Sequence, residues 1–139
     1  MVSNMTEYYT VDEDGTQRWY KDGIVHREDG PAIIYSDGTL IWYKNGKCHR
    51  ENGPAIIYHN GSQEWYKNDK LHREDGPAEI HPNGYQKWYQ NNKLHRENGP
   101  AIIRPDGKKE WWINGIPHDR ISNKISFNII TNHNIKDGF

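Results

Sequence analysis

Residues 38–60 read GTLIWYKNGKCHRENGPAIIYHN, and this unit decides the fold because the chain repeats it every 23 residues. Glycine opens each unit, at Gly15, Gly38, Gly61, Gly84 and Gly107. The first four units are close copies, the fifth decays, and residues 9–14 match the end of a unit. The sequence therefore predicts a cap with a partial repeat at 1–14, five repeats at 15–120, and a C-terminal cap or oligomerisation segment at 121–139.

Each unit contains three turn-like steps, which in the second unit are Asp37-Gly38, Asn45-Gly46 and the stretch 51–54. Three reversals per unit would run successive units in opposite directions, so equivalent residues could not stack. We therefore expect one strand at 39–44, a long connection at 45–53, a second strand at 55–58 and a tight turn at 59–61. Recurrent Gly, Pro and Asn/Asp disfavour helix. The sequence thus predicts an all-β protein with an elongated antiparallel sheet of hairpin repeats.

Comparison of the repeats with one another indicates which positions the sheet requires. Tryptophan recurs at Trp19, Trp42, Trp65, Trp88 and Trp111, and an Ala-x-Ile pattern recurs from Ala32, Ala55, Ala78 and Ala101. We expect the tryptophans to stack as an aromatic spine that replaces a deep core. Ala and Ile should share one face by strand alternation. The positions that tolerate charge are expected to face water or a ligand; they are Ile33, Ile56, Glu79 and Ile102, followed by Tyr35, Tyr58, His81 and Arg104.

Composition excludes several classes of function. The chain has 18 Lys+Arg against 19 Asp+Glu, and this balance disfavours binding of long nucleic acids. No apolar run approaches the roughly 20 residues of a membrane span, and residues 1–10 lack the features of a signal peptide. Cys48 is the single cysteine, so no internal disulfide can form. We expect a cytoplasmic protein in a reducing compartment.

Two further rows are candidate ligand-binding residues. Strand alternation places the first row, Tyr20, Tyr43, Tyr66 and Tyr89, opposite the tryptophans, either packed under loops or open as a platform for planar ligands. The second row comprises His26, Arg27, His49, Arg50, His72, Arg73, His95 and Arg96, each pair followed by Glu. In a structural role, Arg would stack on Trp and pair with Glu, while His bonds a loop carbonyl. In a functional role, the Arg and His side chains would bind phosphate or carboxylate.

The spacing of the repeats argues against metal binding and catalysis. Equivalent histidines two strands apart lie about 9–10 Å from one another, too far to share one zinc ion. With one cysteine and no CxxC or HExxH motif, we expect no metal and no other cofactor. A catalytic site is one asymmetric set of unlike groups, whereas here each polar group recurs in similar surroundings. The sequence therefore predicts a protein that is not an enzyme.

The repeat resembles the MORN repeats, in particular their divergent variant form. Trp42, Gly46, Gly53 and the Asn60-Gly61 turn carry the resemblance, which covers about residues 9–120. The chain departs from the common form in its His-Arg-Glu-(Asp/Asn)-Gly-Pro-Ala stretch, and in replacing the loop glycine by Asp69 and Asn92. The resemblance implies a sheet of hairpins that serves as a binding or scaffolding surface. Similar small proteins occur in bacteria, some labelled antitoxin-like, and in phages and large DNA viruses.

Residues 121–139 break the repeat. The alternation of Ile125, Phe127 and Ile129 predicts a capping strand, with a helix as the alternative. This segment would cap its own sheet or pair with a second copy, giving a homodimer.

Our leading hypothesis is a non-catalytic binding protein that holds an anionic, nucleotide-derived small molecule on its aromatic and His-Arg rows. One biological form would be a phage or viral protein that sequesters a host signalling nucleotide in the cytoplasm of a bacterium or infected cell. The alternative is a protein-interaction scaffold or antitoxin-like module in which the His-Arg-Glu row is structural and a partner covers the tyrosines.

Overall fold

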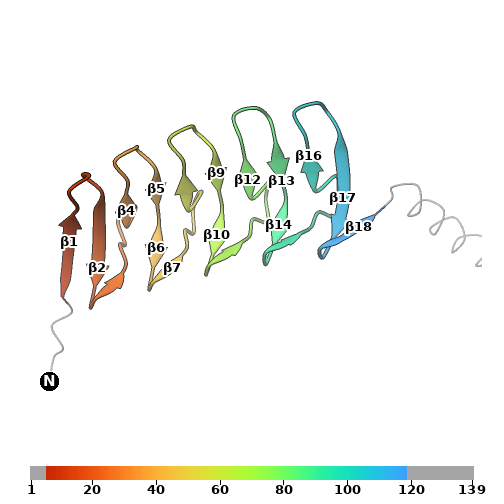
Figure 1. The fold of residues 1–139 in the computed structure, drawn as a ribbon. Helices are drawn as coiled ribbons and strands as arrows, with labels where there is room; N and C mark the ends of the chain where they lie inside the picture. Colours follow the sequence, from red (N-terminus) through yellow and green to blue (C-terminus); the bar gives the residue numbers. More distant parts are fainter. Residues whose placement is uncertain (1–5, 119–139) are drawn as a thin grey trace, which may run out of the picture.

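The computed structural model describes residues 6–118, which form β-strands joined by turns and loops with no helix among them (Figure 1). In chain order the strands are β1 (Glu7–Val11), β2 (Gln17–Lys21), β3 (Ile24–Val25), β4 (Ile33–Ile34), β5 (Leu40–Ile41), β6 (Tyr43–Lys44), β7 (Lys47–Cys48), β8 (Ile56–Ile57), β9 (Gln63–Glu64), β10 (Tyr66–Lys67), β11 (Lys70–Leu71), β12 (Glu79–Ile80), β13 (Gln86–Lys87), β14 (Tyr89–Gln90), β15 (Lys93–Leu94), β16 (Ile102–Ile103), β17 (Lys109–Ile113) and β18 (Ile116–His118). Across residues 6–118, no helix is long and apolar enough to cross a membrane. The predicted C-terminal cap at 121–139 lies outside the described residues.

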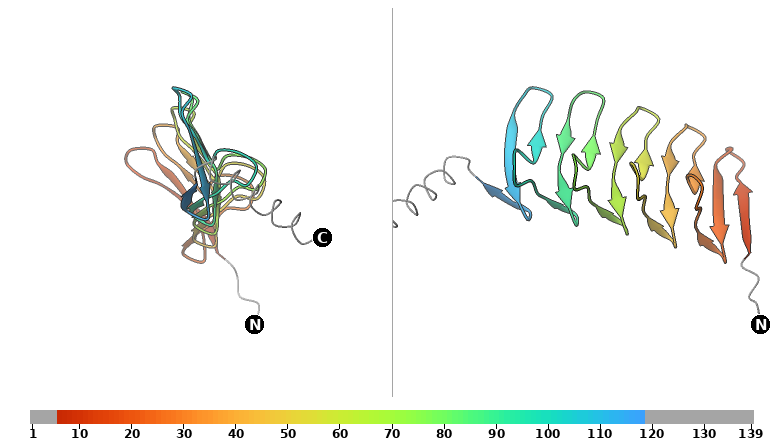
Figure 2. Two further views of the ribbon diagram at one scale, coloured as in Figure 1. Left: turned by 90° about the vertical axis from the view of Figure 1, so that its right-hand side faces the viewer. Right: turned by 180° about the vertical axis from the view of Figure 1, so that it is seen from behind.

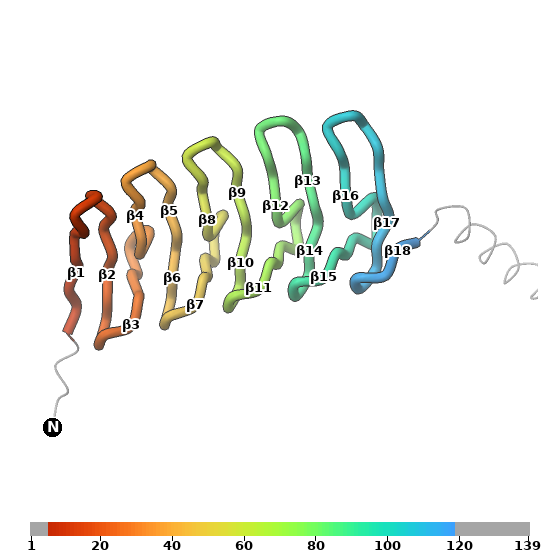
Figure 3. The backbone as a smooth tube through the Cα atoms, in the orientation of Figure 1, coloured from red at the N-terminus to blue at the C-terminus, as the bar shows by residue number. Residues whose placement is uncertain are grey.

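The strands build one long, open antiparallel sheet of twelve strands. Its order is β1-β2-β4-β5-β8-β9-β12-β13-β16-β17-β18, with β3 also paired to β2; β6–β7, β10–β11 and β14–β15 form separate two-stranded ladders. The repeats lie side by side as a row of hairpins (Figures 1 and 3), and seen end-on they overlay with a gradual twist (Figure 2, left). The prediction of an all-β, elongated antiparallel sheet is confirmed.

The turn that opens each repeat combines glycine with an Asp or Asn side chain. Gly38 has a φ of 92°, a left-handed conformation that other residues rarely adopt. Immediately before it, the carboxylate of Asp37 accepts the backbone N–H of Thr39 at 2.8 Å. The same bond recurs at the other four turns, from Asp14, Asn60, Asn83 and Asp106. These local bonds explain why every unit begins at an Asp-Gly or Asn-Gly step.

The opposite edge of the sheet contains a second tight reversal. Asn45 and Gly46 have φ angles of 52° and 76°, and β7 returns antiparallel to β6. The predicted long connection at 45–53 is therefore wrong in its first part, because the Asn-Gly step forms a two-residue hairpin. Only residues 49–54 form a loop, so each unit still has two reversals and equivalent residues stack.

In the third and fourth repeats this hairpin turn lacks glycine. Asp69 and Asn92 take its place, each with a φ of 65°. Their side-chain oxygens accept the backbone N–H groups of Cys48 and Leu71 in the preceding repeat, both at 2.7 Å. Asp and Asn tolerate the left-handed region better than other non-glycine residues, and here they also tie neighbouring repeats together.

The two faces of the sheet differ in what covers them. Residues directly opposite in an antiparallel pair share a face, so Ala, Trp and the recurring Ile lie on one face and the recurring tyrosines on the other, while Tyr9 of β1 pairs with Trp19 on the Trp face. The alanines at the centre of the Trp face are the best buried residues of the chain: Ala32, Ala55, Ala78 and Ala101 are all 0% exposed. The loops at 26–31, 49–54, 72–77 and 95–100 fold over this face, since their arginines contact the tryptophans.

The central positions of the Tyr face are better buried than the sequence suggests. Ile33 and Ile102 are 7% and 5% exposed, so the expectation that this position faces water or a ligand is wrong in the first and fourth repeats. Strand alternation places a large side chain two residues on along the same face, Tyr35 beside Ile33 and Arg104 beside Ile102. In the third repeat the position holds Glu79, whose side chain is 13% exposed.

Candidate functional site

The candidate site is the row of four His-Arg-Glu-(Asp/Asn)-Gly-Pro loops, which we call the loop row: residues 26–31, 49–54, 72–77 and 95–100. Each loop is anchored to the following repeat. The backbone N–H of Arg50, for example, donates to the carbonyl of Tyr66 at 3.2 Å, and equivalent bonds fix the other three loops. The sheet thereby holds all four loops in one orientation.

In every loop the arginine lies flat on the tryptophan of its own repeat. The Arg Cζ atoms stand 3.9, 3.8, 4.0 and 4.0 Å from the ring centroids of Trp19, Trp42, Trp65 and Trp88. These are cation–π distances, so the predicted stacking of Arg on Trp is confirmed. The expected aromatic spine is corrected accordingly: the layer over these four rings is made of guanidinium groups.

The proline and the glycine of each loop also contact the guanidinium group. Nη1 of Arg50 donates to the carbonyl oxygen of Pro54 at 3.0 Å, and the other three arginines make the same bond to their prolines. A Cβ on Gly99 would stand 2.8 Å from Cζ of Arg96. Only glycine leaves room for the flat arginine at this position.

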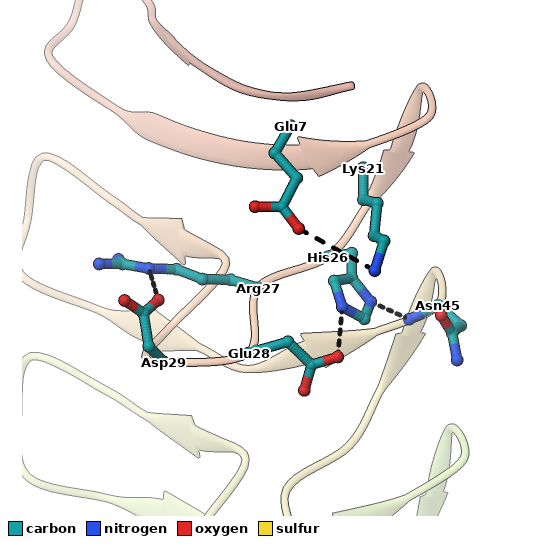
Figure 4. A network of polar contacts seen from close by, with 7 residues as sticks. All are labelled: Glu7, Lys21, His26, Arg27, Glu28, Asp29 and Asn45. Carbon is teal, nitrogen blue, oxygen red and sulfur yellow. Dashed lines mark hydrogen bonds and ion pairs between the residues drawn. The ribbon is translucent and has the colours of Figure 1, made fainter. Parts of the chain in front are cut away.

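The side chains of the loop histidines form hydrogen bonds with other groups of the protein. The backbone N–H of Asn45 donates to Nδ1 of His26 at 2.8 Å, so the ring carries its proton on Nε2, which lies 2.8 Å from Oε1 of Glu28 (Figure 4). The other three histidines repeat both contacts, with the distance to the glutamate growing to 3.4 and 3.7 Å in the third and fourth repeats. Histidine therefore links neighbouring repeats.

Two details of the expected structural role are wrong. Glutamate pairs with histidine rather than arginine, and histidine accepts a backbone N–H rather than donating to a carbonyl. The carboxylate partner of each side chain lies two residues along the loop rather than at the adjacent position. His26 thus meets Glu28, and Arg27 meets Asp29 (Figure 4).

The residue two positions after arginine alternates along the row. In the first and third loops it is an aspartate, and Nε of Arg27 and Arg73 donates to Asp29 and Asp75 at 3.0 and 2.9 Å. In the second and fourth loops it is Asn52 and Asn98. Within residues 6–118, the arginines of those two loops, Arg50 and Arg96, have no carboxylate in ion-pair contact. Burial lowers the pKa of Arg50, as expected for a cation without a compensating charge.

Grooves separate successive loops. Between the first and second, second and third, and third and fourth loops they have volumes of about 540, 510 and 580 Å³. Each is floored by a tryptophan, and lysines line the first two, Lys44 and Lys67. The middle groove lies between Arg50 and Asn52 of one repeat and Trp65 and Lys67 of the next. It therefore combines an unpaired guanidinium with an aromatic ring.

The predicted tyrosines differ in their relation to this site: Tyr43 is among the residues that line the first groove, and Tyr20 lines a hollow of about 340 Å³ beside His26 and Arg27. Strand register pairs Tyr43 with Cys48 and Tyr66 with Leu71 on the face opposite the loops. Burial raises the pKa of Tyr43 and Tyr66, and the hydroxyl of Tyr66 also hydrogen-bonds to Glu64. The structure thus brings together the predicted His and Arg residues, places Tyr20 and Tyr43 in hollows beside the first loop, and leaves Tyr66 and Tyr89 outside the lining of the grooves. In the second and third grooves the aromatic lining residues are Trp65 and Trp88.

Sequence comparison of the repeats missed an asymmetric polar cluster on the Tyr face. His81 joins Ser62 through Nδ1 at 3.1 Å and Glu79 through Nε2 at 2.6 Å, and Lys87 lies 3.3 Å from Glu79. Glu79 and His81 are the positions where the third repeat departs from the Ile and Tyr of the first two repeats, which is the signal that could have revealed the cluster. Ser62 is 3% exposed, so its hydroxyl is shielded from a substrate. We assign the cluster to sheet packing.

The described residues contain no group of three or more His, Cys, Asp and Glu side chains placed to hold a metal ion. Cys48 is buried and has a pKa raised by burial to about 12, so its thiol stays protonated.

The chain was compared with protein-family models and with curated proteins. No family model and no curated protein matches it.

Proposed function

We propose that this protein is a non-catalytic binding protein whose loop row holds an anionic ligand at Arg50 and Arg96. The observation that carries this proposal is the alternation of Asp and Asn in the loops. Asn52 and Asn98 stand where aspartate pairs with arginine in the other two repeats. An anion would occupy the place that the aspartate carboxylate takes there.

The chain supplies its own example of the binding geometry. A carboxylate oxygen lies 3.0 Å from Nε of Arg27 and 2.9 Å from Nε of Arg73, while each guanidinium stays on its tryptophan. Arg50 has the same seat, 3.8 Å from the ring of Trp42. Charge-assisted hydrogen bonds of this kind suit carboxylate and phosphate alike. The guanidinium is therefore preorganised for an external anion.

A nucleotide-derived small molecule matches the chemistry of the middle groove. Its phosphate would bind Arg50 and Lys67, and its base would lie beside the Trp65 ring in a groove of about 510 Å³. On this proposal the protein sequesters a nucleotide in the cytoplasm of a bacterium or an infected cell, and it catalyses no reaction. The hairpin repeats and the Trp, Gly and Asn-Gly positions also support membership of the MORN-like repeat proteins.

The test is mass spectrometry of the small molecules released when freshly purified protein is denatured. Wild type is compared with Arg50→Ala and with the double variant Asn52→Asp/Asn98→Asp, which copies the natural first and third loops and so keeps the fold. A nucleotide-like species from wild type alone supports the proposal. If nothing is released, calorimetric titration with a nucleoside monophosphate follows. Equal binding or no binding by wild type and both variants overturns the proposal.

A second candidate function is a protein-interaction scaffold or antitoxin-like module. The observation that favours it is that the His and Arg side chains of every loop make contacts inside the protein, while the loops leave the Tyr face uncovered and Tyr35 is 37% exposed. In this case a charge at Tyr43 or Tyr66 would abolish partner capture in a pull-down, and Arg50→Ala would lower the melting temperature without changing partner binding.

A further inference from the structure

We propose that the loop row binds an extended acidic peptide segment whose carboxylates, six residues apart, bind Arg50 and Arg96 together. This inference rests on the proposed anion sites at these two arginines and names the ligand that can use both.

The first argument is that neighbouring grooves share a loop, so that they follow one another along the row. The same loop residues, Arg50, Glu51 and Asn52, line both the first and the second groove. Arg73 and Asp75 likewise line both the second and the third. Each loop is therefore the shared wall of two grooves, and the three grooves follow one another across four repeats, a longer run than a compact ligand requires.

The second argument is the match between two periods. Successive repeats are two strands apart in the sheet order, which corresponds to about 9.6 Å at roughly 4.8 Å per strand. A polyproline II helix has three residues per turn and rises about 3.1 Å per residue, or roughly 9.3 Å per turn. A peptide in this conformation would present every third side chain to the same position of successive loops.

The third argument is the charge pattern. Arg50 and Arg96 are two repeats apart, about 19 Å at the same strand spacing, and six residues of polyproline II span roughly 19 Å. Between them lies Arg73, already paired with Asp75. The residue facing Arg73, three positions along the peptide, should therefore be neutral. The aromatic floor of Trp65 and Trp88 suits the apolar residues between.

The experiment is calorimetric titration of the full chain at low salt with three synthetic peptides. The matched peptide is acetyl-Glu-Pro-Pro-Gln-Pro-Pro-Glu-amide, in which proline enforces the conformation. The single-charge peptide replaces the first Glu by Gln. The misaligned peptide, acetyl-Glu-Pro-Pro-Gln-Glu-Pro-Pro-amide, keeps both charges but turns the second carboxylate by a third of a turn. We expect the matched peptide to bind roughly tenfold or more tightly than either of the others, because its second contact is intramolecular.

Matched variants locate the two contacts. Asn52→Asp and Asn98→Asp should each reduce the affinity of the matched peptide to that of the single-charge peptide. Asp75→Asn should open a site at Arg73, and should raise the affinity of a peptide with Glu at its first and fourth positions. Circular dichroism checks that all variants are folded, as expected for loops that the protein already contains.

The outcomes separate this inference from the proposed function. Equal affinity for the three peptides, with nucleoside monophosphate binding still lost in Asn52→Asp, overturns the peptide inference and leaves the anion site standing. Unchanged binding of every probe in Asn52→Asp and Asn98→Asp overturns both.

Discussion

Replacing Trp65 by alanine tests whether the layer of tryptophan and arginine holds the sheet together. Trp65 is in the third of five repeats, is half-buried and lies under Arg73 at 4.0 Å. A tryptophan buries roughly 150–250 Å² when covered, which at about 25 cal/mol per Å² and half burial gives roughly 2–3 kcal/mol. The lost cation–π contact adds about 1 kcal/mol. We expect Trp65→Ala to lower the free energy of unfolding by about 3–4 kcal/mol.

The assay is urea unfolding followed by circular dichroism, with Trp65→Phe and Arg73→Ala as controls. Trp65→Phe should lose less because it keeps a ring under the guanidinium. The double variant should lose about 1 kcal/mol less than the sum of its two single variants, since both remove the same stack. A loss below about 1 kcal/mol for Trp65→Ala would refute the view that this layer stabilises the sheet.

Three further predictions follow from the local contacts. A hydrogen bond from His49 lowers the pKa of Glu51, and Arg73 lowers that of Asp75; both groups stabilise the fold above their unfolded pKa values near pH 4. This stability is lost as the pH falls through the folded values, so the urea midpoint should drop below about pH 4, and less so in Glu51→Gln. The Cys48 thiol, with a pKa of about 12, should not react with Ellman's reagent at pH 8 until the protein unfolds; reaction in the folded protein would contradict its burial. Gly99→Ala should destabilise by roughly 1–2 kcal/mol through displacement of the Arg96 guanidinium, and an equal cost in an Arg96→Ala background would show that the clash lies elsewhere.

The sequence was sufficient to predict the sheet because the repeat leaves few alternatives. Units of identical register must place equivalent residues side by side, and only two reversals per unit allow it. The prediction went wrong at residues 45–48, where Asn45 and Gly46 form a hairpin turn and a short strand returns. The Asn45-Gly46 pair was recognised as one of three possible turns in the unit. Knowing that only two of the three reverse the chain did not decide which two they are.

The candidate site could be predicted only in part. The sequence indicated that Arg would stack on Trp, since these were the recurring cation and ring. It gave the wrong partner for Glu, because the loop pairs histidine with the glutamate two positions on rather than arginine with the adjacent glutamate. The difference between Asp29 and Asn52 was visible in the sequence, yet its meaning depends on which atoms reach Nε of the arginine. That geometry is a property of the folded loop.

The Tyr face could not be read from the repeats because its polar residues arise where repeats differ. Each of Ser62, Glu79 and His81 occupies a position that holds another residue type in the neighbouring units. The Ser62–His81 contact joins residues 19 apart that flank different strands of the third repeat, and Lys87 of the fourth repeat reaches Glu79, so the cluster depends on the register of the sheet rather than on any local motif.

The most direct test of the central claim is an NMR titration that follows the Nε–Hε signals of the loop arginines as inorganic phosphate is added. The signals are assigned with the Asp and Asn loop variants. The account predicts that the signals of Arg50 and Arg96 shift while those of Arg27 and Arg73, already bound to aspartate, stay in place. Equal shifts of all four signals, or no shift at Arg50 and Arg96, would contradict it.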